Sequence, residues 1–385
     1  MRVFLIAGEP SGDKLGAALM AGLKELAPGV TFDGIGGAQM AAEGLVSRFP
    51  MRELSVMGIA EILPKYRALK RRIRETVQTV IDTAPDVLIT IDSPDFSFRV
   101  ARQVKASSSV RTVHYVAPTV WAWRPGRAAK IAGFIDHLLT LLPFEPPYFT
   151  QHGMACDFVG HPVVAEATPT GADITAFRGK HNLGDAPIML VLPGSREGEV
   201  RRLGGDFGDA VQRVLAQQPQ MRVIVPAAAP VAGLVKETVN QWQVDALVLD
   251  PSRLSPEESN RQKRTAFHTA DVALAASGTV SVELAAARTP MVIAYRMNWL
   301  SFRLIRAMAL VDTVTLVNLV SDTRAVPEFL GPECQPEAIA KALCQTIGDP
   351  DAQLAAMDLT MERLGRNAEA PGLRAARAVL NRLSD

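Results

Sequence analysis

The chain has 385 residues, of which 48% are hydrophobic and 21% are charged, and its formal net charge is +1. This length allows two or three domains that each bury a core, and the composition is ordinary for a globular enzyme. The balanced charge argues against nucleic acid as the main partner, and three cysteines without a C-x-x-C pair predict a reducing compartment and no metal site.

The first predicted element is a buried strand at Val3–Ile6, which enters a glycine-rich turn and then a helix. The turn, GEPSGD at Gly8–Asp13, lacks the G-x-G-x-x-G spacing, and Lys14 lacks the neighbours of a Walker A lysine. Its glycines allow another chain segment or a ligand to approach closely. Because Glu9 and Asp13 bring negative charge, we expect sugar hydroxyls rather than phosphate beside them.

A basic amphipathic stretch follows at Met57–Val80, with apolar residues at helical spacing and lysines and arginines between them. Such a helix can lie on an anionic membrane surface, or it can pack on the core with a solvated outer face. By itself the pattern favours the second interpretation, and Trp299–Leu310 has the same character. Since the chain begins with a strand and has no long uncharged apolar run, we expect no signal peptide, no spanning helix and a cytoplasmic protein.

Strand-like runs alternate with helical stretches along the chain, which predicts parallel sheets with right-handed crossovers. In the first half the predicted strands are Val3–Ile6, Val87–Ile91, Thr112–Val116, His137–Leu141 and Asp157–Val159. In the second half they are Met189–Leu192, Arg222–Val225, Ala246–Leu249, Val272–Ala275 and Met291–Ala294. The Gly- and Pro-rich segment 160–187 is predicted to link the two halves.

These observations predict an α/β chain with two Rossmann-like doubly wound domains and a cleft between them. The predicted domains span residues 1–165 and 186–350. Residues 351–385 are predicted to form C-terminal helices that cross back, with the last helix at 371–383 completing the first domain.

Two carboxylates follow the predicted strand Val87–Ile91. Asp92 and Asp95 flank Pro94, which ends the strand, and they lie beside the glycine-rich turn if both strands share a sheet. One of them can accept the proton of an attacking sugar hydroxyl. Alternatively, both cap the next helix through Ser97, and these residues alone favour capping.

Two tryptophans, Trp121 and Trp123, lie in a proline-containing loop that ends in basic residues. Aromatic side chains at the end of a strand suit packing against a sugar ring or an acyl chain. They equally suit a hydrophobic plug of the core, and the pattern does not separate the two interpretations.

In the second half, LPGSR follows an apolar strand and precedes a helix. Gly194 and Ser195 can present backbone N–H groups to a phosphate, and Arg196 can pair with it. The alternative is a plain turn with a solvated arginine.

A second loop, SGTVSVE, places Ser277, Gly278 and Thr279 at a predicted helix N-terminus, where free amides favour a diphosphate. Glu283 lies one turn further on the same face and can accept ribose hydroxyls. Alternatively, Thr279 is an N-cap and Glu283 a helix-start charge. Two such loops in one half favour the nucleotide interpretation.

Together these motifs resemble those of the lipid-A-disaccharide synthase family, bacterial glycosyltransferases that join two acylated glucosamines. They occur in family order over nearly the whole chain: GEPSGD (Gly8–Asp13), ELSVMGIAEIL (Glu53–Leu63), DSPDF (Asp92–Phe96), HYVAPTVWAWR (His114–Arg124), LPFE (Leu142–Glu145), LPGSR (Leu192–Arg196), SGTVSVE (Ser277–Glu283), TVTLVNLV (Thr313–Val320) and VPEFL (Val326–Leu330). The resemblance implies a GT-B fold and an inverting transfer from UDP-2,3-diacylglucosamine to 2,3-diacylglucosamine 1-phosphate.

Residue by residue, the resemblance implies that Asp95 is the general base. Glu9 and Ser11 are grouped with it as catalytic candidates, because they match family positions that line the cleft on the acceptor side. The resemblance places on the UDP side Arg196, Ser277, Gly278, Thr279, Glu283 and Asn318. We further expect the acceptor side to include Gly12, Asp92, Trp121 and Trp123. No metal or other cofactor is implied, since amides and Arg196 can neutralise the leaving UDP.

Acylated substrates also give the basic amphipathic stretch a purpose, so the resemblance favours peripheral binding to the cytoplasmic face of the inner membrane. The rival enzymes are other GT-B proteins, such as UDP-GlcNAc 2-epimerases or the N-acetylglucosaminyltransferase of peptidoglycan assembly. These share the nucleotide loops but need not carry GEPSGD or the tryptophan loop. A non-catalytic UDP-sugar-binding protein at the membrane surface is the remaining alternative.

Overall fold

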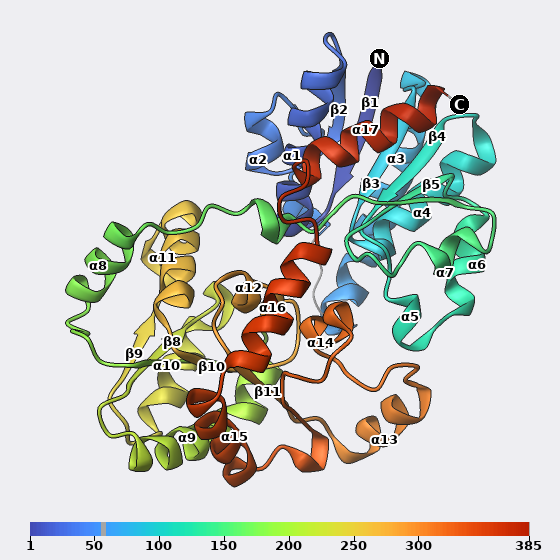
Figure 1. Ribbon diagram of the computed structural model, residues 1–385. Coiled ribbons are helices and arrows are strands. Elements are labelled where there is room, and N and C mark those ends of the chain that lie inside the picture. The colour runs from blue at the N-terminus through green and yellow to red at the C-terminus, as the bar shows by residue number, and fades with distance from the viewer. Residues whose placement is uncertain (55–58, 385) are drawn as a thin grey trace. The chain divides into compact units, whose positions relative to one another are not determined.

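The computed structural model describes residues 1–54 and 59–384, with side chains except at 59–66, 299–301, 304–305 and 384. The chain forms two compact units: unit 1 comprises Met1–Ala165 and Leu364–Asp385, and unit 2 comprises Glu166–Arg363. Each unit contains a six-stranded parallel sheet with helices around it (Figure 1). The predicted pair of parallel α/β sheets is confirmed.

In unit 1 the strand order is β2-β1-β3-β4-β5-β6. The strands are β1 (Arg2–Ala7), β2 (Thr31–Ile35), β3 (Val87–Ile91), β4 (Arg111–Tyr115), β5 (His137–Thr140) and β6 (Ala155–Phe158). The helices are α1 (Pro10–Leu26), α2 (Ala38–Ala42), α3 (Ile59–Thr83), α4 (Pro94–Ser107), α5 (Val120–Trp123), α6 (Gly126–Ala132), α7 (Pro147–Thr150) and α17 (Pro371–Ser384).

Both faces of this sheet are buried, which explains why its central strands are continuous apolar runs. Along β1, Val3 and Leu5 belong to the core cluster of α1 and α17, whereas Phe4 and Ile6 belong to that of α3 and α4. The C-terminal helix α17 packs beside α1, as Figure 1 shows.

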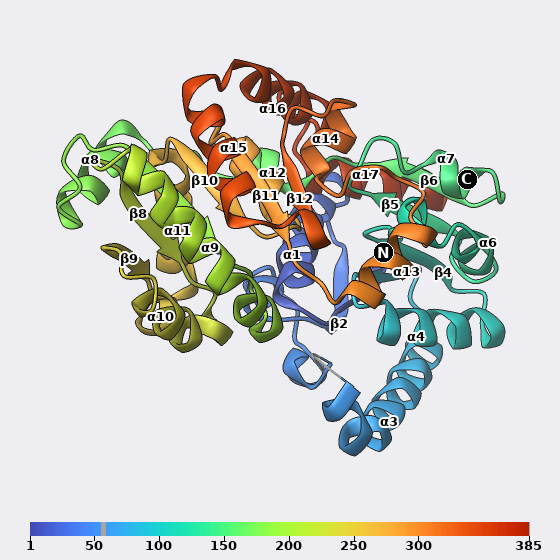
Figure 2. The same ribbon diagram turned by 90° about the horizontal axis from the view of Figure 1, so that it is seen from below.

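In unit 2 the strand order is β12-β11-β10-β7-β8-β9. The strands are β7 (Ile188–Leu192), β8 (Arg222–Pro226), β9 (Ala246–Leu249), β10 (Val272–Ala275), β11 (Met291–Tyr295) and β12 (Glu328–Leu330). The helices are α8 (Gly171–Lys180), α9 (Glu197–Gln217), α10 (Ala232–Asn240), α11 (Pro256–Thr269), α12 (Val280–Ala286), α13 (Trp299–Met308), α14 (Leu316–Ser321), α15 (Pro336–Gly348) and α16 (Asp351–Arg363). Helices α9 and α15 pack together on one face of the sheet (Figure 2).

Two edge strands, β2 and β12, are not among the predicted strands. β2 has the sequence TFDGI and is only partly buried, and β12 has three residues. In β2 the polar Asp33 and the glycine after it interrupt the apolar pattern. Gly34 is required there because its φ is +136° and a Cβ would lie 1.9 Å from the carbonyl oxygen of Leu5.

The segment predicted as a link contains α8, which packs against α11 of unit 2. Of the C-terminal helices, α16 belongs to unit 2, and the chain returns to unit 1 at Leu364, before α17.

The basic amphipathic stretch forms most of α3, although its first residues, 57 and 58, lie outside the described residues. Ile73, Val77 and Val80 are buried in the core beside Phe4 and Ile6. This half of the helix is therefore core-packed with a solvated outer face. In the described part of the chain, no helix is long and apolar enough to cross a bilayer.

Candidate functional site

The glycine-rich turn after β1 packs against the turn after β3. The two strands are neighbours, with Ala7 opposite Ile91. A Cβ on Gly8 would lie 2.5 Å from Ser93 Oγ, and a Cβ on Gly12 would lie 3.3 Å from the carbonyl oxygen of Ile91. The glycines therefore serve the close approach of another chain segment, and Gly12 itself is buried.

Both candidate carboxylates lie at this point, where the strand order of unit 1 reverses and such sheets bind ligands. Asp92 is half-buried, and Asp95 is exposed on the first turn of α4. Neither side chain caps the helix: its N-cap is Ser93, which makes no capping bond, and the Ser97 hydroxyl donates to the backbone oxygen of Asp92 at 2.8 Å. The capping interpretation is thus wrong.

The backbone at this turn is strained, with φ of +52° at Asp92 and +46° at Ser93. Left-handed conformations of non-glycine residues cost energy and concentrate at functional sites. Among the residues that the structure describes, no hydrogen bond or ion pair holds the carboxylate of Asp92 or Asp95. Both are therefore free to act on a ligand.

The three residues of the glycine-rich turn that were predicted to contact a ligand differ in how far they are exposed. Glu9 is half-buried at the N-cap of α1, and Ser11 is exposed on the first turn of that helix. Asp13, in contrast, is 4% exposed and accepts the N–H groups of Gly37 at 2.7 Å, Gln39 at 2.9 Å and Met40 at 3.1 Å. The expectation that Asp13 meets sugar hydroxyls is wrong, because this carboxylate caps α2.

We expect Asp13→Ala to lower the free energy of unfolding by about 2–3 kcal/mol, since it removes a cap and leaves amides without an acceptor. Urea denaturation of both proteins measures the difference. Asp245→Ala is the matched control, because the Asp245 side chain is 93% exposed and its ion pair with Arg222 is at the surface. An equal loss in both variants would contradict the capping role.

The two tryptophans of the loop after β4 have different environments. Trp121 is 6% exposed, meets Phe144 edge-to-face at 5.2 Å between ring centroids, and donates from Nε1 to Glu145 Oε1 at 3.1 Å. It is a core side chain, so its predicted place on the acceptor side is wrong. Trp123 is 40% exposed, with the Arg124 guanidinium 3.7 Å from its ring centroid. Only Trp123 remains a candidate for ligand contact.

Glu145, the last residue of the LPFE motif, is 3% exposed. Besides Trp121, it accepts the N–H of Leu142 at 3.0 Å. Burial raises the pKa of Glu145 to about 7, against the lowering effect of these hydrogen bonds. Because the folded-state pKa exceeds the usual value, Glu145 favours the folded state at low pH, and this contribution is lost as pH rises through about 7.

We therefore expect Glu145→Gln to reduce the fall in stability between pH 4.5 and pH 7 by about 3 kcal/mol relative to the parent protein. Urea titrations followed by tryptophan fluorescence across this range test the expectation. Glu25→Gln changes an exposed glutamate of α1 and should leave the pH dependence intact. Identical pH dependence in Glu145→Gln and the parent protein would show that Glu145 does not titrate in this range.

In unit 2 a cavity of about 460 Å³ lies at the carboxyl ends of β7, β8, β9 and β10. The strand order reverses between β7 and β10, so this is again the position at which such sheets bind ligands. The predicted residues that line it are Arg196, Ser277, Gly278, Thr279 and Glu283. Helix α11 adds Ser259, Gln262 and Lys263. Sequence reasoning missed these because α11 has the polar pattern of a surface helix.

Sequence reasoning also missed Glu199. It is 7% exposed, and its Oε2 accepts the N–H groups of Ser195 at 3.0 Å and Arg196 at 3.3 Å. Its Oε1 accepts from the Arg196 guanidinium at 3.1 Å. The expectation that the Ser195 amide is open to phosphate is wrong in this structure, because Glu199 occupies it. The available signal was the capping-box spacing from Arg196 to Glu199.

At the second loop, SGTVSVE, the N-terminus of α12 has no side-chain cap. Thr279 is exposed at the N-cap of α12 and makes no side-chain capping bond. Glu283 forms an ion pair with Lys263, with 2.5 Å between Oε2 and Nζ. The cavity thus joins two cations, Arg196 and Lys263, to polar groups of the loop. Within the described residues, no group of three or more His, Cys, Asp or Glu side chains is placed to hold a metal ion.

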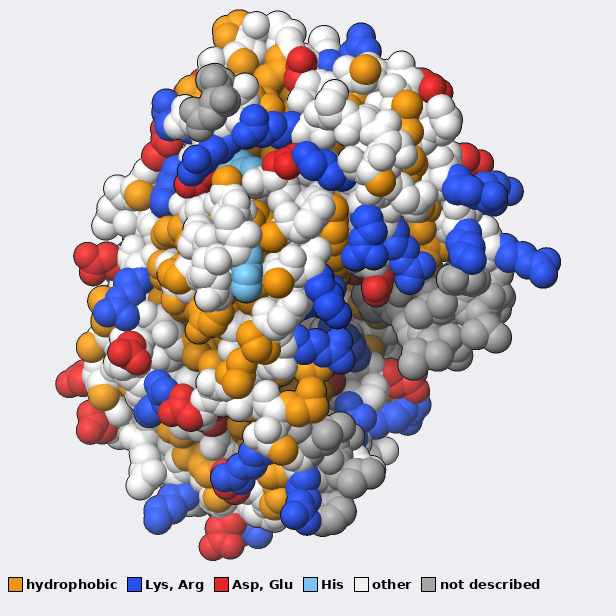
Figure 3. Space-filling model, turned by 90° about the vertical axis from the view of Figure 1, so that its right-hand side faces the viewer, with side chains coloured by type: hydrophobic (Ala, Val, Ile, Leu, Met, Phe, Trp, Pro, Cys, Tyr) orange, Lys and Arg blue, Asp and Glu red, His pale blue; other side chains and the backbone are white. Residues whose placement is uncertain are grey.

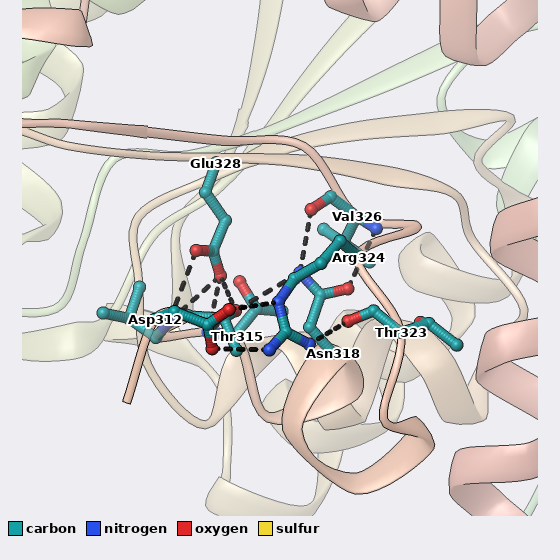
Figure 4. A network of polar contacts seen from close by, with 9 residues as sticks. Asp312, Thr315, Asn318, Thr323, Arg324, Val326 and Glu328 are labelled. Atoms are coloured by element: carbon teal, nitrogen blue, oxygen red, sulfur yellow. Dashed lines mark hydrogen bonds and ion pairs between the residues drawn. The ribbon is translucent and has the colours of Figure 1, made fainter. Parts of the chain in front are cut away.

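Asn318 does not line this cavity. It is 1% exposed, its Oδ1 accepts the Val326 N–H at 3.0 Å, and its Nδ2 donates to the Val326 carbonyl at 2.9 Å (Figure 4). Its amide holds the segment around Val326 in place, and its expected position near UDP stays a prediction.

Comparisons with known proteins agree on one family. A family model described as lipid-A-disaccharide synthetase matches residues 3–378. The lipid-A-disaccharide synthase of Ruegeria pomeroyi is 63% identical over 383 residues, which covers 100% of this chain and 96% of that protein. The enzyme of the same name from Rhodospirillum centenum is 46% identical over 385 residues, which covers 98% and 94%.

Solved structures share the fold at much lower identity. A Staphylococcus aureus MnaA–UDP co-structure aligns with a TM-score of 0.67 and 12% identity, covering 100% of this chain and 96% of that one. The UDP-GlcNAc 2-epimerase of Neisseria meningitidis, bound to UDP-GlcNAc, aligns with a TM-score of 0.63 and 11% identity, covering 100% of both chains. These likenesses establish the GT-B fold alone, since function does not follow from fold.

Proposed function

The chain belongs to the lipid-A-disaccharide synthase family, and we propose that it transfers a 2,3-diacylglucosaminyl group from UDP to the 6-hydroxyl of 2,3-diacylglucosamine 1-phosphate. The products are UDP and the β(1→6)-linked disaccharide phosphate. The full-length match at 63% identity carries this proposal. It favours the transferase over the epimerases, which match in fold alone.

Unit 2 is the proposed donor-binding unit. Its cavity offers Arg196 and Lys263 for the diphosphate, with the Ser277–Thr279 backbone, and Glu283 for the ribose hydroxyls. As the bond from the sugar to the diphosphate breaks, negative charge grows on the leaving UDP. Fixed cations and N–H groups stabilise that charge without reorganisation. This requires no metal ion.

Unit 1 is the proposed source of the base. Asp95 accepts the proton of the 6-hydroxyl while that oxygen attacks the anomeric carbon from the face opposite UDP. Its exposure and lack of a partner among the described residues suit proton transfer to a bound substrate. Asp92, on the same turn, is the alternative base, and Glu9 and Ser11 are proposed contacts of the acceptor.

The deciding experiment is UDP release from UDP-2,3-diacylglucosamine in detergent with EDTA, with and without the monosaccharide phosphate. We expect acceptor-dependent UDP and a disaccharide phosphate. Activity that EDTA abolishes and a divalent cation restores would contradict the metal-independent step. Turnover of an unacylated UDP-sugar only would point instead to the epimerase-like alternative.

We also infer that α3 binds the anionic membrane that supplies these acylated substrates. Arg67, Arg71 and Arg74 are exposed, and Arg71 forms a surface ion pair with Glu75 at 3.6 Å. Arg72 is more buried and forms ion pairs with Glu53 at 2.8 Å and Glu75 at 2.9 Å. Figure 3 shows one face of the molecule on which Lys and Arg side chains lie beside hydrophobic ones.

Reversing Arg67, Arg71 and Arg74 to Glu should weaken binding to phosphatidylserine vesicles by at least about a hundredfold, because each basic residue that is lost near such a surface removes about 1 kcal/mol and each new glutamate is repelled. Reversal of three exposed arginines of unit 2, Arg201, Arg213 and Arg222, is the control. Co-sedimentation with vesicles measures both. An equal loss in the control would show that net charge, not α3, decides binding.

A further inference from the structure

Unit 2 has a second cavity, of about 680 Å³, beside the first. Arg196, Glu199 and Ser277 line both cavities, so the two meet at the proposed diphosphate position. The rest of the second cavity is formed by the end of β11, by α13 and the segment after it, and by β12 with the turn that follows. Its volume is within the usual range of ligand sites.

The second cavity has an apolar wall formed by Met297, Phe302, Val311 and Leu330. Each of these side chains is only partly buried, so part of its apolar surface faces the cavity. Phe302 is held against the turn after β12: a Cβ on Gly331, whose φ is +59°, would lie 2.6 Å from the Phe302 ring. A nucleotide or a hydrophilic sugar has little apolar surface to bury against such a wall.

One acidic residue of the lining, Glu328, already has hydrogen-bond partners on neighbouring residues. Its Oε1 accepts the Thr313 hydroxyl at 2.6 Å and the Thr315 N–H at 2.7 Å, and the Val314 N–H donates to both oxygens (Figure 4). These bonds hold the carboxylate to residues 313–315 at the edge of the cavity. An apolar ligand can enter without leaving it short of hydrogen bonds.

Apolar surface continues outward from the cavity. Leu310 is 60% exposed and Val314 41% exposed, on the segment that lines the cavity through Val311 and Thr313. A ligand with a long hydrocarbon chain can therefore extend past the cavity along this segment. Burying each methylene favours binding by a similar increment.

We propose that this cavity takes an acyl chain of the donor, and so sets which chain lengths the protein accepts. The inference rests on the proposed function. In that donor the acyl groups are attached at sugar carbons 2 and 3, next to the carbon that carries UDP. A chain there leaves the sugar within a few bonds of the diphosphate, where the two cavities meet. The acceptor carries no UDP, so binding of UDP does not bring its acyl chains to the residues that line both cavities.

The test compares Met297→Trp, which fills the cavity, with Met308→Trp, which makes the same change at an exposed position outside its lining. The measurement is kcat/KM for UDP-diacylglucosamine donors of increasing chain length, with one acceptor. In the parent protein each methylene held by the cavity should raise kcat/KM by about fourfold. Met297→Trp should remove this gain for the longest donors, by about tenfold, while the control keeps it.

A second pair of variants keeps the result independent of a folding defect in one of them: Leu330→Trp in the wall, and Val46→Trp at an exposed position of unit 1 as the control. An unchanged Kd for UDP shows that each variant is folded at the nucleotide cavity. Equal losses for short and long donors, or a chain-length profile that follows the acceptor instead, would overturn the inference and leave the proposed function standing. A parent protein inactive with every acylated donor would overturn both.

Discussion

Asp95→Asn is expected to lower kcat by about 10²–10⁴-fold, because the amide keeps the shape of the carboxylate but cannot accept the proton of the acceptor hydroxyl. The thermal midpoint should not change, since Asp95 caps no helix and is exposed on the first turn of α4. The Kd for UDP should also be unchanged, because the proposed UDP residues all belong to unit 2. Steady-state kinetics, calorimetry and UDP titration measure the three quantities.

The matched control is Asp92→Asn, which makes the same change two residues earlier in the same turn. We expect a smaller loss of kcat, because Asp92 is half-buried, whereas Asp95 is exposed to a bound substrate. If Asp95→Asn retains full turnover and Asp92→Asn does not, the base is Asp92.

Gly194→Ala is expected to weaken UDP binding by about 10–100-fold. Gly194 has φ of +120°, and an added Cβ would lie 2.5 Å from Glu199 Cβ and 2.6 Å from Glu199 Oε2. The new methyl group therefore displaces the carboxylate that orients Ser195 and Arg196. Charge-assisted hydrogen bonds of this kind are worth about 1.5–3 kcal/mol, which corresponds to the stated range of affinity.

Gly205→Ala is the control for this variant. Gly205 lies in α9, where a Cβ would meet no atom within 4 Å, so alanine should stabilise the helix by about 0.5–1 kcal/mol. Calorimetric titration with UDP compares both variants with the parent protein. Unchanged affinity in Gly194→Ala would mean that the LPGSR loop does not hold the diphosphate.

Of the twelve strands in the part of the chain that the structure describes, ten were predictable from short apolar runs, and the central ones are apolar throughout because both faces of their sheets are buried. The other two lack such a run: Asp33 and Gly34 interrupt the apolar pattern of β2, and β12 has three residues. The loops at the ends of β1, β3, β7 and β10 were equally visible, since a strand that ends in Gly, Pro or Ser before a helix is a local pattern.

The role of an individual polar or aromatic side chain could not be predicted from such local patterns. Asp13 and Trp121 belong to motifs that suggest a ligand, yet Asp13 caps α2 and Trp121 is bound to Glu145 in the core. In both cases the partner is more than twenty residues away in the chain. A side chain's partners at that separation depend on packing, on which the local pattern carries no information.

The α/β class, the two parallel sheets, the loops that carry the candidate residues and, through the motifs, the family could all be inferred from the residue order. These properties follow from local periodicity and from residue order, both of which can be read along one chain. Three features became visible only when the chain is folded: Glu199 holds the LPGSR loop, Lys263 forms an ion pair with Glu283, and a second cavity with an apolar wall adjoins the first. Each of these depends on the distance between side chains on different elements, which is set when the helices pack on the sheet and bury their apolar faces.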